Sequence, residues 1–363
     1  MYKINPKKFI SIALACILLA FFLLLIGFDR TNNRVFVFAE ENIEVIACES
    51  EKEEEQKAFI KWIDFNADSG SLKAVLKLCK EYRAKGTELE FSQVLAYLAI
   101  KNSNKFSLNS TNTILKKLRT HLDGGGSILD FYADNKYYNY YLESYHAIFD
   151  GLVGEFSRCE YHDGEYVISQ TEEYGIKGFF PIAADFHFSH YDDFGSSRSY
   201  GYKRRHLGHD FMGQIGTPII AIEGGIITEL GWNKYGGWRI GIRSFDQKRY
   251  YYYAHLRKDR PFAAGLALGD EVKSGQVIGY LGHTGYSIKE NVNLKTGSPH
   301  LHLGLQIIFD KSQEKGSGEI WLDLYGISKF LLSERAKAVR DDSTKEWVSQ
   351  TVKVCSGRVY SQT

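Results

Sequence analysis

The spacing of hydrophobic residues divides the chain into three parts. The first is an apolar run from Phe9 to Phe28 that contains no charged residue. A run of this length is sufficient to cross a bilayer as one helix. Lys3, Lys7 and Lys8 precede it, so the positive-inside rule places residues 1–8 in the cytoplasm and the rest outside. We expect a single-pass cell-membrane anchor over residues 9–28. A cleaved signal peptide, which would give a secreted form, is the alternative.

The second part, residues 40–156, has helical periodicity. Its clearest segment is 71–84, where apolar residues recur at i, i+3, i+4 and i+7. Further helices are predicted over 92–100, 111–121 and 137–156, separated by breaks that include three consecutive glycines at 124–126. This part shows no catalytic constellation. It is interpreted as a helical domain of unknown role. This domain is expected either to position the rest of the protein or to bind an unidentified protein partner.

The third part has the short apolar runs and glycine turns of strands. After an expected linker over 157–177, the pattern predicts a mainly antiparallel β domain over 178–332. A helix over 324–339 is expected to close it. The segment 333–363 then comprises the end of that helix and a loosely ordered polar tail. The fold class is therefore multidomain, with a transmembrane helix, an all-α domain and a β domain.

Charge and cysteine content narrow the class of protein. The 45 Lys and Arg residues balance 44 Asp and Glu residues, and a net charge of +1 gives no field for nucleic-acid binding. The basic cluster Lys203-Arg204-Arg205 is interpreted as a solvated loop. No cysteine pair has C-x-x-C spacing, so no structural zinc site is indicated. Disulfides, for example between Cys159 and Cys355, and free thiols both fit Cys48, Cys79, Cys159 and Cys355.

Two histidine motifs carry the candidate chemistry. His300 and His302 lie two apart in a predicted strand, so their side chains should face one cavity. His206 and Asp210 are expected to close that cavity from the other side. Zinc with three protein ligands keeps a position open for a hydrolytic water. These residue types therefore predict a zinc hydrolase site.

The order of these motifs resembles the lysostaphin-type, or LytM-like, zinc endopeptidases, which cut peptidoglycan peptides. The resemblance covers about residues 178–332, and it includes Tyr253-Ala254-His255-Leu256 and the glycine-punctuated segment 269–279. It implies a duplicated-hybrid-motif-like fold with one zinc ion held by His206, Asp210 and His302. It also implies that His300 is the general base and that His255 stabilises the oxyanion.

The resemblance implies a zinc-dependent endopeptidase that acts on peptidoglycan stem peptides or cross-bridges in cell-wall remodelling. A non-hydrolytic scaffold, or an activator of other wall hydrolases, is the alternative, although all five required side chains are present. Residues 288–298 are an insertion that should border the cleft. Tyr252 and Tyr253 are predicted substrate contacts. His209 is interpreted as a bystander rather than an extra ligand, and His190 as a residue that caps a loop rather than lining the cleft.

Overall fold

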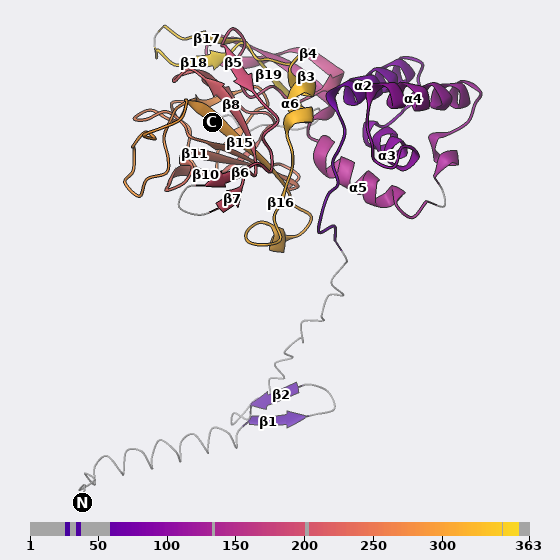
Figure 1. The fold of residues 1–363 in the computed structure, drawn as a ribbon, viewed down its shortest axis with the longest axis horizontal. Helices are drawn as coiled ribbons and strands as arrows, with labels where there is room; N and C mark the ends of the chain where they lie inside the picture. The colour runs from indigo at the N-terminus through magenta and orange to yellow at the C-terminus, as the bar shows by residue number, and fades with distance from the viewer. Residues whose placement is uncertain are drawn as a thin grey trace, which may run out of the picture. The chain divides into compact units, whose positions relative to one another are not determined.

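The computed structural model describes residues 59–132, 135–199, 203–342 and 344–355, together with the backbone of 26–29 and 34–37 (Figure 1). Strands β1 (Ile26–Asp29) and β2 (Arg34–Val37) pair antiparallel. Residues 9–25 of the expected membrane span lie outside the described residues, and 26–28 lie in β1 rather than in a helix. Among the described segments, no helix is both long and apolar enough to cross a membrane.

The helical region is confirmed, with four α-helices and one 3-10 turn among the described residues up to 149. They are α2 (Ser69–Ala84), α3 (Phe91–Lys101), α4 (Leu108–Asp123), η1 (Ile128–Phe131) and α5 (Tyr138–Phe149). Asp68 caps α2, because its carboxylate accepts hydrogen bonds from the backbone N–H groups of Gly70 and Ser71. The apolar face of α2 is buried, as its periodicity predicts.

The helix predicted over 137–156 ends earlier, at Phe149, and the expected linker is a β-hairpin. Strands β3 (Val153–His162) and β4 (Glu165–Ile176) pair antiparallel. Asp163 and Gly164 join them with φ of +49° and +97°. Asp-Gly is a strong hairpin signal because both positions of a type I′ turn require positive φ. The linker prediction for 157–177 was therefore wrong, and this dipeptide was the overlooked signal.

One large antiparallel sheet forms the centre of the β domain and confirms the predicted class. Its strand order is β13-β10-β11-β12-β15-β8-β5, and β16 pairs with β15. Smaller sheets surround it, formed by β9 with β14 and by β6 with β7. The bounds are β5 (Phe188–His190), β6 (Ser197–Ser199), β7 (Lys203–Arg205), β8 (His209–Gly213), β9 (Pro218–Ile220), β10 (Gly225–Asn233), β11 (Gly237–Ser244), β12 (Arg249–Ala254), β13 (Glu271–Val272), β14 (Val277–Tyr280), β15 (His300–Ile307), η2 (Lys311–Gln313) and β16 (Ile320–Trp321).

The C-terminal segment differs from its prediction. Helix α6 spans only Tyr325–Leu331, and β17 (Ala338–Arg340), β18 (Trp347–Ser349) and β19 (Thr351–Cys355) follow it. Strand β19 adds to β3, so residues up to 355 are not a loose tail. Lys353 is buried there because its Nζ donates to the Ile176 carbonyl and to the Glu334 carboxylate.

The strand register also excludes the disulfide considered above. Cys159 lies opposite Val352, whereas Cys355 lies opposite Phe156, so the two thiols are three register positions apart. Within the described ranges, Cys79 and Cys159 are free thiols. Cys48 lies outside those ranges.

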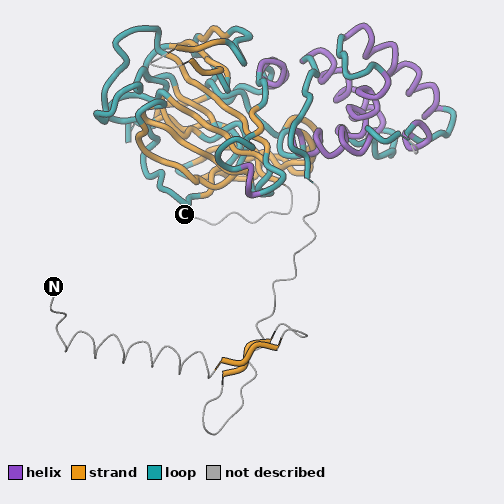
Figure 2. The backbone as a smooth tube through the Cα atoms, turned by 60° about the horizontal axis from the view of Figure 1, so that its bottom comes forward, coloured by secondary structure: helices purple, strands orange, loops and turns teal. Residues whose placement is uncertain are grey.

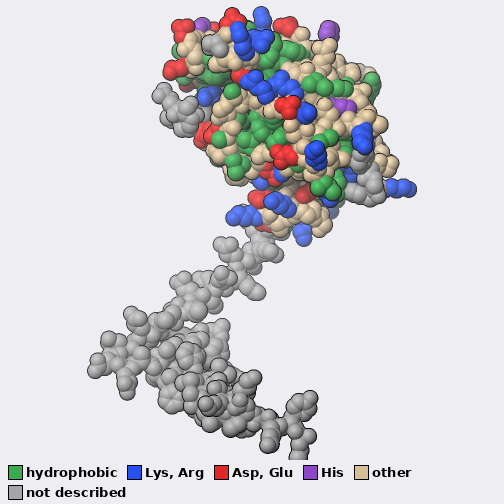
Figure 3. Space-filling view, turned by 90° about the vertical axis from the view of Figure 1, so that its left-hand side faces the viewer, with side chains coloured by type: hydrophobic (Ala, Val, Ile, Leu, Met, Phe, Trp, Pro, Cys, Tyr) green, Lys and Arg blue, Asp and Glu red, His purple; other side chains and the backbone are tan. Residues whose placement is uncertain are grey.

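Helices and sheets share one hydrophobic core from Phe59 onwards, and this part of the chain forms one compact unit (Figure 2). Phe91 of α3 stacks on Phe330 of α6 with ring centroids 6.0 Å apart. On the face in Figure 3, basic and acidic side chains are interspersed, in agreement with the balanced charge of the sequence.

Candidate metal centre

Three neighbouring strands bring the predicted residues together. Strand β15 lies between β8 and β12, so His302 has Asp210 opposite it on one side and Ala254 on the other. His255 follows Ala254 directly. Because β15 is a regular strand, His300 and His302 share one face while the alternate residues, such as Leu301, are buried. Asp210 therefore reaches His302 from the adjacent strand of the same sheet, and not from across the cavity as expected.

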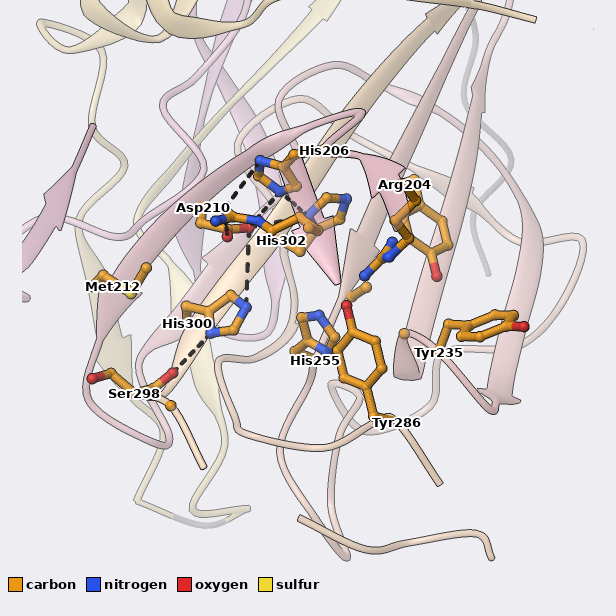
Figure 4. A pocket seen from close by; sticks show the side chains of 15 residues that line it. Arg204, His206, Asp210, Met212, Tyr235, His255, Tyr286, Ser298, His300 and His302 are labelled. Atoms are coloured by element: carbon orange, nitrogen blue, oxygen red, sulfur yellow. Dashed lines mark hydrogen bonds and ion pairs between the residues drawn. The ribbon is translucent and has the colours of Figure 1, made fainter. Parts of the chain in front are cut away.

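Three side-chain atoms converge at the centre of this face (Figure 4). His206 precedes β8, and its Nε2 lies 3.1 Å from Asp210 Oδ1 and 2.9 Å from His302 Nδ1. His302 Nδ1 lies 3.0 Å from the same carboxylate oxygen. Two imidazole nitrogens and one carboxylate oxygen are a donor set that zinc accepts, with metal–ligand distances of about 2.0–2.2 Å. The cluster therefore fits a metal site.

The protonation of His206 explains the short contact between the two imidazoles. Burial lowers its pKa, but hydrogen bonds to Asp193 and Asp210 raise the pKa of His206 to about 9. Without a metal, the protonated Nε2 can donate to His302 Nδ1, whose own pKa is lowered by burial. A metal ion would take the place of that proton, because a histidine ligand must be deprotonated at the ligating nitrogen.

Asp193 orients His206 and was not predicted from the sequence. His206 Nδ1 lies 3.1 Å from the Asp193 carbonyl oxygen and 3.2 Å from its Oδ2, so this nitrogen donates and Nε2 faces the cluster. Arg198 donates both to Asp193, at 2.8 Å, and to Asp210, at 3.0 Å. Burial raises the pKa of the Asp193 carboxyl, but the contacts with His206 and His209 hold that pKa well below its usual range. Such outer partners fix the orientation of metal-ligating histidines.

His209 and His190 belong to the network around Asp193, and neither is part of the cluster of His206, Asp210 and His302. His209 is fully buried, with Nδ1 3.3 Å from Asp193 Oδ1 and Nε2 2.8 Å from His190 Nδ1. Burial, assisted by the neighbouring His209, lowers the pKa of His190 to about 4. The neutral His190 can therefore donate through Nδ1 to His209 Nε2.

His300 and His255 lie beside the cluster, and each has its Nδ1 atom hydrogen-bonded to a backbone carbonyl oxygen. His300 Nδ1 lies 2.8 Å from the Ser298 carbonyl oxygen, and its Nε2 lies 4.0 Å from Asp210 Oδ1. His255 Nδ1 lies 2.7 Å from the Thr284 carbonyl oxygen, and burial holds the pKa of His255 well below its ordinary value. Both Nδ1 atoms donate to carbonyls, so Nε2 is the nitrogen of each ring that is left for a ligand in the cavity.

The two candidate tyrosines point to opposite faces of β12. Tyr252 lines the cavity and accepts a hydrogen bond from Asn233 Nδ2. Tyr253 is 0% exposed, and its hydroxyl accepts from the Ile222 backbone N–H at 3.0 Å. A substrate contact by Tyr253 is therefore wrong, because the period of two places it in the core.

The cavity over the cluster has a volume of about 340 Å³. Gly297 and Ser298, from the inserted segment, lie on its wall as expected. Gly208 lies against His302, where a Cβ would come within 2.6 Å of Cε1. This contact explains the requirement for glycine within the first histidine motif.

A buried His-Asp-His donor set, with two further histidines in an open cavity, defines a candidate metal centre of the hydrolase class. Residues 204–314 match the family model described as Peptidase family M23. This region of the chain is a peptidase family M23 domain, and the resemblance to the lysostaphin-type endopeptidases is confirmed.

Several proteins with known names are similar in sequence to part of this chain. The L-Ala–D-Glu endopeptidase of Bacillus subtilis is 37% identical over 126 residues, which are 35% of this chain and 37% of that protein. The glycyl-glycine endopeptidase of Staphylococcus capitis is 42% identical over 98 residues, which are 27% of this chain and 23% of that protein. The chain thus spans well under half the length of these relatives. The solved catalytic domain of Staphylococcus simulans lysostaphin is 33% identical, covering 39% of this chain and 92% of that one, with a TM-score of 0.30.

Proposed function

We propose that this protein is a zinc-dependent endopeptidase that cleaves peptide bonds of peptidoglycan. The observation that carries the proposal is the convergence of His206 Nε2, Asp210 Oδ1 and His302 Nδ1 within about 3 Å of one another, with His300 Nε2 4.0 Å from the same carboxylate oxygen. The M23 domain and the two endopeptidase relatives support it.

The residues divide the chemistry between them. Bound zinc supplies Lewis acidity, which polarises a carbonyl and acidifies water. His300 takes the proton of the attacking water at Nε2, because its Nδ1–H is held by the Ser298 carbonyl. His255 lines the cavity with its Nδ1–H held by the Thr284 carbonyl; the oxyanion role expected for it needs a proton at Nε2, which the lowered pKa of His255 opposes. Arg198 keeps the carboxylates of Asp193 and Asp210 in place.

Two kinds of bond are candidates for cleavage. One relative is named for the L-Ala–D-Glu bond and the other for the glycyl-glycine bond, so stem peptide and cross-bridge both belong to this proposal. Because peptidoglycan lies outside the cytoplasm, the proposal also places the described domain there. The membrane anchor remains a prediction for residues 9–25, which lie outside the described residues, whereas 26–28 belong to β1.

The test measures peptide release from purified peptidoglycan, with bound zinc counted in each protein. We expect the chain to hold one zinc ion and to release peptides. His300→Ala should keep the zinc and lose the activity, whereas His302→Ala should lose both. His187→Ala is a matched control, because His187 is an exposed histidine outside the cavity lining. A protein that binds zinc but releases nothing would refute hydrolysis and support a scaffold or activator.

A further inference from the structure

We propose that Arg204 binds a carboxylate of the substrate and thereby selects a peptide with a free acidic group beside the scissile bond. This inference rests on the proposed endopeptidase function and specifies its substrate. The sequence alone placed Arg204 in a solvated basic cluster. The structure instead places its side chain in the lining of the cavity over the metal centre.

Arg204 is held at the cavity by stacked rings. Its guanidinium carbon lies 5.3 Å from the centroid of the Tyr286 ring, which is within the range of a cation–π contact. The Tyr286 ring is stacked in turn on His255, with centroids 5.7 Å apart and planes inclined by 24°. Figure 4 shows Arg204 reaching towards the space between His302 and Tyr286.

The turn that carries Tyr286 is fixed in an unusual conformation. Tyr286 has φ of +46°, which is rare for a bulky residue. Its backbone N–H donates to the Tyr235 carbonyl, and the next N–H, of Ser287, donates to the Lys234 carbonyl. Strain of this kind persists where the surrounding structure holds a functional position. The platform under Arg204 is therefore built before any ligand arrives, which lowers the entropy lost on binding.

Arg204 lacks a carboxylate of its own. Within the described ranges no Asp or Glu forms an ion pair with it, whereas Arg198, the other arginine of the cavity, is bound to Asp193 and Asp210. Asp210 is the only carboxylate among the described residues of the lining, and it belongs to the metal cluster. Among the described residues of the lining, Arg204 is therefore the one uncompensated cation, and its charge favours an anionic ligand.

A carboxylate is the group that suits this cation. A guanidinium carries N–H donors in a planar fork that matches the two oxygens of a carboxylate. A glutamate that takes part in a peptide chain through one carboxyl group keeps its other carboxyl group free. Of the two bonds considered above, the alanyl–glutamyl bond therefore offers a carboxylate beside the scissile bond, and a glycine bridge offers none. The geometry favours the stem peptide.

The experiment compares two peptides that differ in one group. Both contain the L-Ala–D-Glu bond, but one has the free glutamyl carboxylate and the other has a carboxamide of nearly the same shape. Pentaglycine is the third substrate. Each is offered to the zinc-loaded full chain, to Arg204→Gln and to Lys203→Gln. Lys203 is the matched control, because it is the exposed neighbour in β7 and lines neither this cavity nor the adjoining groove.

We expect kcat/KM for the carboxylate peptide to exceed that for the carboxamide by about tenfold or more, as for a hydrogen-bonded charge pair. Arg204→Gln should remove this preference, and Lys203→Gln should keep it. A preference that survives in Arg204→Gln, or faster cleavage of the carboxamide or of pentaglycine by the parent, would overturn the inference. So would digestion of whole peptidoglycan without cleavage of either peptide. If nothing is cleaved at all, including peptidoglycan, the proposed function fails and the inference fails with it.

Discussion

Asp193→Asn is the sharpest test of how the metal centre is held. The Oδ2 atom of Asp193 accepts from Arg198 at 2.8 Å and lies 3.2 Å from His206 Nδ1, while its Oδ1 lies 3.3 Å from His209 Nδ1. Asparagine keeps the size of the side chain but has one acceptor oxygen and no charge. The amide oxygen can occupy only one of the two positions, so an NH2 group then faces either Arg198 and His206 or His209. His206 also loses the charged partner that fixes its orientation.

The magnitude follows from the role of Asp193 as an outer partner of a ligand. Removing such a partner typically weakens metal affinity about 10- to 100-fold, which is about 1.4–2.8 kcal/mol. We expect a loss in this range for zinc, because His206, Asp210 and His302 all remain. Activity at saturating zinc should fall less than the affinity, since His300 and His255 do not contact Asp193.

The assay is zinc competition against a chromophoric chelator, with thermal unfolding of the zinc-free proteins as a check on folding. Asp192→Asn is the matched control, because Asp192 is an exposed carboxylate one residue away. Equal zinc affinity in the parent and Asp193→Asn, with the fold intact, would show that Asp193 does not orient the centre.

Three further changes test other parts of the structure. Gly208→Ala would place a Cβ 2.6 Å from His302 Cε1, so we expect a folded protein by circular dichroism that has lost its zinc; retained zinc would contradict this. Tyr253→Phe leaves a buried backbone N–H without an acceptor, so urea titration should show a loss of about 1–3 kcal/mol while kcat/KM is unchanged. A reduced kcat/KM in folded protein would argue against its place in the core. The hydrogen bond to Asp150 raises the pKa of His146 in the folded protein. The pair therefore stabilises the fold fully at pH values below the unfolded-state pKa of about 6.5. This stabilisation is lost as the pH rises through the higher folded-state pKa. The difference in unfolding free energy from His146→Gln, at most about 1 kcal/mol, should therefore shrink as the pH rises above about 6.5; a difference that grows with pH would refute this reasoning.

The sequence predicts those features that depend on local periodicity. The i, i+3, i+4 spacing in 71–84 gives helix α2 and its buried face, and alternation along the tyrosine run separates Tyr251 and Tyr253 from Tyr252. The two histidine motifs likewise indicate the donor set, because each motif is short and has a fixed spacing.

Contacts between distant segments are not predictable in this way. Asp193 and Arg204 lie outside any regular period, and their neighbours are set by the pairing of β6 with β7 and by the loop before β8. The register that sets His302 opposite Asp210 joins residues 92 positions apart, and local patterns carry no information about it. The hairpin after α5 was missed for another reason, since its Asp163-Gly164 turn was present in the sequence as a local signal.

The register of strand β12 affects both the contact of the sheet with the helical region and the side chains beside the metal centre. Its odd-numbered residues face the core, where buried Arg249 donates to the Ala147 carbonyl at the end of α5 and to the Glu223 carboxylate. Its even-numbered residues, such as Tyr252, face the cleft, and β12 pairs directly with the strand that carries His302. A slip of one residue would exchange the two faces, exposing the arginine and burying the cleft residues. The buried ion pair that joins α5 to the sheet therefore also fixes which side chains β12 presents to the metal centre.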